Sequence, residues 1–208
     1  MLTLLVLPGL LGSVLSADIL AIFPHAGKSH YDVFEPLGLE LAARGHQVTV
    51  ISFYPQKTPV ANFTDISLVG TLPIFVNALP LHYLTGSTPT FEFKFIGGIG
   101  LSVCEAVLTS PQVKSLISSG KKFDLLIVEL FNSDCFLSMV DFFGVPYIGL
   151  SSSMALPHHN PRVGNPDSFS SSNNLFLPIL PPFSIFQKLQ NVGYTVGMRL
   201  FRTHYYSV

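Results

Sequence analysis

The chain has 208 residues, a net charge of −1, and 48% hydrophobic against 11% charged residues, where ordinary soluble domains have about 25% charged. The near-zero charge excludes a protein that binds nucleic acid through a basic surface, and the apolar content excludes a disordered chain. Two cysteines are too few for a disulfide-rich scaffold or a zinc site of four cysteines, and we expect no metal site.

Residues 1–16 predict a secretory signal peptide. They carry no charged side chain, and the small residues Ser16 and Ala17 follow the apolar run. If the peptide is cleaved after Ser16, Val14 occupies the third position before the cleavage site, as signal peptidase sites prefer. The run is too short to span a bilayer comfortably, and a buried strand or helix is the alternative. The mature part, residues 17–208, has no uninterrupted apolar stretch of about 18 residues, so we expect it to be soluble or peripheral.

The mature chain begins with a β-α-β pattern. Residues 19–23 are a continuous apolar run, as in a strand that is buried on both faces of a sheet. Apolar side chains then recur at helical spacing after Ser29, and Gly45 follows Arg44 as a helix cap. Residues 48–51 predict a second strand, so the three elements predict a parallel sheet with a right-handed crossover.

The rest of the chain adds a second unit of this kind. Residues 53–100 are less regular and rich in proline, and residues 153–182 are expected to be a long loop. The other expected elements are helices over 101–108 and 113–117, a strand over 123–129, a helix over 134–143, a strand over 145–150 and a helix over 183–201. The predicted fold class is α/β, a Rossmann-like parallel sheet with helices on both faces.

Three loops follow strands of the predicted sheet and carry polar side chains. Ligands of such sheets bind beyond the carboxyl ends of the strands, so we expect residues 24–30, the stretch after Glu129 and residues 151–158 to meet there. The catalytic candidates are His30, Glu129 and Asp134. In the same loops, Gly27, Ser29 and Ser152 are predicted to bind substrate.

His30 is the strongest catalytic candidate. It lies where the first helix begins, and the positive potential there keeps an imidazole neutral and able to accept a proton. A carboxylate from another strand end would fix its tautomer and stabilise its charged form. The alternative is that His30 only caps the helix.

Other patterns give weaker predictions. Gly98 and Gly100 lack the third glycine of a dinucleotide-binding loop and predict a flexible turn. Ser153 replaces the second glycine of a nucleophile elbow, which disfavours a serine hydrolase. The adjacent histidines at 158–159 predict a solvated loop rather than a metal site. Cys135 is expected to be a small buried residue rather than a reactive thiol.

Asn62 begins the sequon Asn-Phe-Thr. Behind a signal peptide, this sequon predicts a glycosylated surface loop in the lumen of the secretory pathway.

The sequence resembles the opening of UDP-glycosyltransferases, particularly the insect microsomal enzymes. The matching stretches are FPHAGKSH at 23–30, FEPL at 34–37, RGHQVTVI at 44–51, NFTD at 62–65, FDLLIVE at 123–129 and NPRVGNP at 160–166. The resemblance implies the N-terminal half of a GT-B fold, in which the first Rossmann-like half binds the sugar acceptor and the second holds the UDP-sugar. It also implies residence in the lumen of the endoplasmic reticulum.

The resemblance implies roles for individual residues. The family's base maps onto His30, which would deprotonate an acceptor hydroxyl that displaces UDP with inversion. The family's partner acid is an Asp. Glu129 occupies its place in this sequence, and Asp134 is the alternative partner for His30. Small lipophilic acceptors agree with a Phe-rich stretch over residues 75–95, where Phe91 and Phe95 are expected to line the pocket. No cofactor is implied beyond the UDP-sugar as co-substrate.

The family's nucleotide-binding signature and its C-terminal membrane helix with a basic tail have no counterpart in these residues. We therefore expect residues 17–208 to be an incomplete acceptor-binding domain, inactive alone and attached to the membrane only through the missing helix. One alternative is a secreted or lumenal module that binds apolar molecules without turnover. Another is an inactive partner that associates with homologous transferases.

Overall fold

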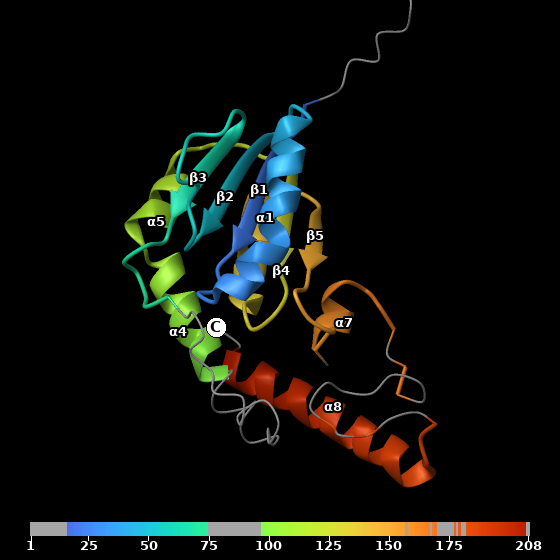
Figure 1. Ribbon diagram of the computed structural model, residues 1–208. Helices are drawn as coiled ribbons and strands as arrows, with labels where there is room; N and C mark the ends of the chain where they lie inside the picture. The colour runs from blue at the N-terminus through green and yellow to red at the C-terminus, as the bar shows by residue number, and fades with distance from the viewer. Residues whose placement is uncertain are drawn as a thin grey trace, which may run out of the picture.

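A five-stranded parallel sheet forms the centre of the molecule, with the strand order β3-β2-β1-β4-β5 (Figure 1). The computed structural model describes residues 16–74, 97–156, 158–166, 168–169, 177, 179 and 182–206. The strands are β1 (Asp18–Phe23), β2 (Gln47–Ser52), β3 (Phe63–Ser67), β4 (Leu125–Glu129) and β5 (Tyr147–Leu150). Every neighbouring pair is parallel. The strand order reverses between β1 and β4, which is where open α/β sheets bind their ligands.

Helices cover both faces of this sheet, which confirms the predicted fold class (Figure 1). The described helices are α1 (Lys28–Ala43), α4 (Gly97–Leu108), α5 (Pro111–Ser118), the 3-10 helix η2 (Asp134–Phe136), α6 (Leu137–Phe143), α7 (His159–Arg162) and α8 (Ile185–Tyr206). On one face, Phe34 and Ala42 of α1 pack against Val48 and Val50. The apolar side chains of α4, α5, η2 and α6 pack on the other. Among the described helices, none has the length and apolarity needed to cross a bilayer.

The strand β3 was not expected, because residues 53–100 are irregular and rich in proline. It contains Thr64, Asp65 and Ser67 and lies at the edge of the sheet, only partly buried. An edge strand has a neighbour on one side only, so it does not need the continuous apolar pattern by which the central strands were recognised. The short helix α7 is a second addition, within the predicted loop of residues 153–182.

Asn62 lies at the turn before β3, with its side chain exposed and its backbone at φ 60°. Its amide Nδ2 donates to the carbonyl of Ala42 at the end of α1 (3.2 Å), and its Oδ1 accepts from Gln47 Nε2 (3.0 Å). The side chain therefore satisfies a carbonyl at the open end of the helix. Glycosylation at this asparagine stays a prediction.

A disulfide joins Cys104 in α4 to Cys135 in η2, with the Cα atoms 6.0 Å apart. Cys135, expected to be a small buried residue rather than a reactive thiol, is partly buried and disulfide-bonded. The bond ties α4 to the segment that follows β4, and this segment leads away from the carboxyl edge of the sheet.

Candidate active site at the carboxyl edge of the sheet

Three of the predicted site residues meet at the strand-order reversal. His30 lies in the first turn of α1, Glu129 ends β4, and Ser152 follows β5. Glu129 Oε1 lies 2.6 Å from His30 Nδ1, and Ser152 Oγ lies 2.9 Å from the same nitrogen. The loops after β1, β4 and β5 thus come together as expected for a parallel sheet.

These contacts fix how His30 can hold its protons. The Glu129 side chain is 1% exposed and that of His30 is 17% exposed. A carboxylate is an acceptor only, so Nδ1 carries the proton that it donates to Glu129, and Nε2 of the neutral ring keeps its lone pair. No described residue forms a hydrogen bond with Nε2. The ring can therefore accept a proton at Nε2 from a bound molecule.

The structure places the other predicted residues as follows. The second acid candidate, Asp134, does not reach His30: its Oδ2 accepts from Arg162 (3.2 Å), and its side chain is 10% exposed. Gly27 is buried, and Ser29 is exposed in the first turn of α1. Ser152 contacts His30 itself. Phe91 and Phe95 lie outside the described residues.

A second histidine of the same loop lies flat against His30. The ring of His25 is 3.7 Å from that of His30 between centroids and is inclined by 14°. The backbone N–H of Gly27 donates to His25 Nδ1 (2.9 Å), and a Cβ at position 27 would lie 2.8 Å from this ring. Burial, together with repulsion from His30, lowers the pKa of His25 to about 3. Sequence reasoning missed His25, although it follows the same strand as His30.

Phe131, in the loop after β4, packs edge-on against both imidazoles. Its ring centroid lies 4.7 Å from that of His30 and 5.4 Å from that of His25. Its carbonyl accepts from Nε2 of His158 (3.0 Å) and of His159 (2.9 Å). The backbone N–H of Leu156 donates to His159 Nδ1, so the proton of that ring is on Nε2.

Both of these histidines are buried, so the expectation of a solvated loop was wrong. Adjacent side chains do point apart in an extended strand. Here the backbone turns into α7 at these residues, and both side chains reach one carbonyl. The pair holds the Phe131 loop against the rest of the site.

Two glycines let the backbones of α4 and β5 approach the loop that follows β4, which contains Phe131. A Cβ at Gly100 would lie 2.4 Å from the Asn132 carbonyl oxygen, and one at Gly149 would lie 2.3 Å from Leu130 Cδ1. Gly98 and Gly100 lie within α4, so the predicted flexible turn was wrong. The loop between Glu129 and η2 is thus held by a helix on one side and by β5 on the other.

Comparison with curated proteins finds UDP-glycosyltransferases. UDP-glucosyltransferase 2 of Dactylopius coccus is 33% identical over 185 residues, which cover 86% of this chain and 35% of that protein. UDP-glycosyltransferase UGT4 of the same insect is 28% identical over 86% of this chain. The chain belongs to the UDP-glycosyltransferase family. It spans about a third of the length of the curated relatives that it matches.

A viral relative extends the comparison. The ecdysteroid UDP-glucosyltransferase of Lacanobia oleracea granulosis virus is 29% identical over 73% of this UDP-glycosyltransferase chain and 34% of its own length. Among solved structures, the glycotransferase of kitacinnamycin covers 71% of this chain and 33% of its own, at 15% identity and a TM-score of 0.44. CalG4, the calicheamicin glycosyltransferase, covers 93% of this chain and 46% of its own length, with the same identity and TM-score. No protein-family model matches the chain.

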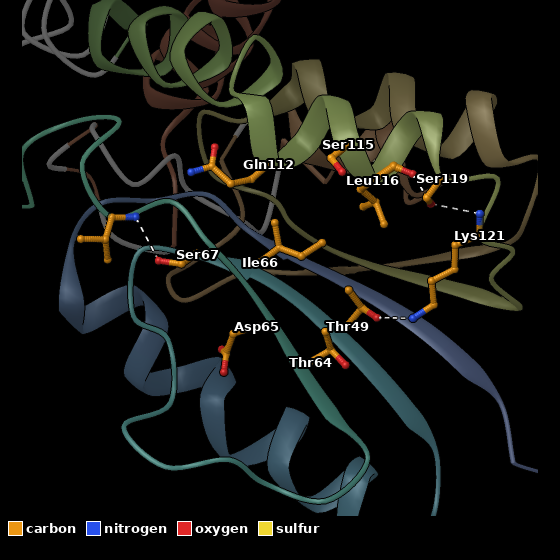
Figure 2. A pocket seen from close by; sticks show the side chains of 11 residues that line it. Thr49, Thr64, Asp65, Ile66, Ser67, Gln112, Ser115, Leu116, Ser119 and Lys121 are labelled. Atoms are coloured by element: carbon orange, nitrogen blue, oxygen red, sulfur yellow. Dashed lines mark hydrogen bonds between the residues drawn. The ribbon is translucent and has the colours of Figure 1, made fainter.

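A cavity of about 500 Å³ lies elsewhere in this UDP-glycosyltransferase chain, between α5 and the strands β2 and β3 (Figure 2). Its lining combines polar side chains with the apolar Ile66, Val69 and Leu116, and Lys121 Nζ donates to Thr49 Oγ1 across it (2.8 Å). His25, His30 and Glu129 are not among its lining residues. Within the described parts of the chain, no cluster of three or more metal-ligating His, Cys, Asp or Glu side chains occurs.

The neutral state of His25 predicts how the stability of this UDP-glycosyltransferase chain depends on pH. An exposed histidine in the unfolded chain has a pKa of about 6.5, whereas the folded value is about 3. Between these values the unfolded state binds one more proton, so the free energy of unfolding decreases as the pH falls from 6.5 towards 3. The contribution of His25 to this slope is at most about 1.4 kcal/mol per pH unit.

Chemical denaturation between pH 4 and 7 measures this contribution as the difference between the wild type and His25→Asn. The Asn Oδ1 can accept from Gly27 as Nδ1 does, but it does not titrate. We expect a shallower slope in this variant. Equal slopes in the wild type and His25→Asn would show that His25 titrates as an exposed histidine does.

Proposed function

We propose that the chain is the acceptor-binding part of a UDP-sugar-dependent glycosyltransferase that transfers a hexose with inversion. His30 acts as the general base. The observation that carries the proposal is the bond between His30 Nδ1 and the buried Glu129, which leaves Nε2 with a lone pair that no described residue uses. The relatives, which are UDP-glucosyltransferases by name, support the donor class.

The proposed reaction is a single displacement. The acceptor hydroxyl gives its proton to His30 Nε2 while its oxygen forms a bond to the anomeric carbon. The bond between this carbon and UDP breaks, and UDP leaves with the electron pair. Glu129 stabilises the imidazolium that forms, because its carboxylate already accepts the proton on Nδ1. The donor is a co-substrate, and we assign most of its binding to the part of a GT-B fold that lies outside this chain.

The proposed acceptors are small lipophilic molecules that carry a hydroxyl group. Phe131 lies against the base, so an apolar acceptor would meet an aromatic ring beside the reacting nitrogen. Two viral relatives are named for ecdysteroids, which supports hydroxylated polycyclic acceptors as a class.

The proposed location is the lumen of the endoplasmic reticulum. The predicted signal peptide and the sequon at Asn62 support it, and so does the disulfide between Cys104 and Cys135, because disulfides persist in oxidising compartments. Membrane attachment through a C-terminal helix and association with homologous transferases are part of the same proposal.

A chimera tests the proposed function. In it, this chain replaces the matching segment of the UDP-glucosyltransferase 2 of Dactylopius coccus, to which it is 33% identical. We expect the purified chimera to transfer glucose from UDP-glucose to a phenolic acceptor, with the product of inverted configuration identified by NMR. A folded chimera that binds both substrates and forms no product would contradict the proposal.

A further inference from the structure

His25 presents a hydrogen-bond donor beside the base. The backbone N–H of Gly27 donates to its Nδ1 (2.9 Å), so this nitrogen holds a lone pair and the proton of the neutral ring is on Nε2. No described residue accepts a bond from this Nε2–H group. His25 is only partly buried, and its Nε2 is not among the fully buried polar atoms that lack a partner, so a bound molecule can reach this donor.

His25 and His30 thus offer opposite hydrogen-bonding groups from stacked rings. His30 Nε2 is an acceptor, because the proton of that ring is held on Nδ1 by Glu129. The ring centroids are only 3.7 Å apart, so two neighbouring oxygens of one small molecule can reach both rings. One oxygen would donate its proton to His30, and the other would accept from His25.

The surroundings keep the His25 ring in this orientation. Phe131 packs edge-on against it at 83°, and Gly27 approaches it closely enough that a Cβ there would clash. A positive charge on His25, with its ring 3.7 Å from that of His30, would also oppose the formation of an imidazolium at His30. A neutral His25 donor is therefore the form compatible with the base.

We propose that His25 is a specificity-determining residue, which selects acceptors that carry a second oxygen next to the reacting hydroxyl, such as vicinal diols, catechols and α-hydroxy ketones. This proposal rests on the proposed function, because it places the reacting hydroxyl at His30.

The test compares the binding of two probes to the chain by isothermal titration calorimetry. 4-Nitrocatechol differs from 4-nitrophenol only by a hydroxyl next to the first one. We expect the wild type to bind 4-nitrocatechol about fivefold more tightly, which corresponds to one hydrogen bond. His25→Phe keeps an aromatic ring on His30 without a donor, and we expect its preference to fall to about one.

His25→Gln is the matched control. It loses the acceptor for the Gly27 N–H as His25→Phe does, but its amide can donate where Nε2–H did, so we expect it to restore the preference. His30→Gln should leave the preference between the two probes unchanged, because its amide oxygen can still accept from the hydroxyl that both probes share. In ¹⁵N spectra of the wild type, we expect the His25 proton on Nε2 and a shift of its signal when 4-nitrocatechol is added.

Three results would overturn the proposal: an unchanged preference in His25→Phe, a His25 proton on Nδ1, or no binding of either probe to the wild type. Failure of the proposed function is distinct from these results. A chimera that forms no product while the preference still depends on His25 contradicts transfer, but it supports His25 as a binding determinant. A chimera that transfers glucose with a preference independent of His25 overturns the role of His25 alone.

Discussion

Replacing His30 by Gln is expected to lower the rate constant for glucose transfer by the chimera between about 10²-fold and 10⁴-fold, which is the usual contribution of a general base. A glutamine amide can still accept a bond from the acceptor hydroxyl, but it does not take up the proton. Binding of the acceptor should therefore change far less than turnover. Initial rates at saturating acceptor, compared with the KM for the acceptor, measure the two effects separately.

The control for this variant is His46→Gln. His46 accepts a bond from the backbone of Ala17 before β1 and lies at the opposite end of the sheet, so we expect its variant to keep the rate of the parent chimera. The transfer rate of Glu129→Gln should lie between those of His30→Gln and His46→Gln. This variant keeps an oxygen for His30 Nδ1–H but has no charge to stabilise the imidazolium. A His30→Gln chimera with the parental rate would remove His30 from the chemistry.

The choice between the two candidate acids shows what the sequence could not decide. Val128 of β4 pairs with Ile22 of β1, which brings the end of β4 next to the loop that leads to His30. Alternate residues of a strand face the same side, and Ile127 belongs to the core beneath α1, so Glu129 also faces α1. Asp134 comes after the strand, in η2, where Arg162 binds it. Strand register decides between them, and register is a tertiary property.

The central strands and the helices that flank them were predictable because local patterns define them. Continuous apolar runs gave β1, β2 and β4, and the helix ends at Gly45 and Gly144 have the positive φ expected of glycine caps. The features that were missed depend on residues far apart in the chain. Examples are the disulfide and the bonds from the two buried histidines to the Phe131 carbonyl, and neither leaves a periodic signal.

The second large effect is expected from the disulfide. The bond closes a loop of 31 residues between Cys104 and Cys135, and the entropy of such a loop in the unfolded chain corresponds to roughly 3–4 kcal/mol of stability. We therefore expect Cys104→Ala/Cys135→Ala to lower the free energy of unfolding by about that amount. For a domain of this size, the midpoint of thermal unfolding should fall by roughly 6–16 °C.

Calorimetry of the oxidised wild type, the reduced wild type and the double variant measures this effect and separates it from side-chain packing. Reduction removes the cross-link but keeps both sulfur atoms in the core around Val103 and Phe136, so the reduced protein should lose most of the stability that the double variant loses. If reduction leaves the midpoint unchanged, the two cysteines are not cross-linked in the folded protein. The loop with Phe131 is also held by Gly100, Gly149 and two histidines, so we expect the contact between His30 and Glu129 to survive reduction.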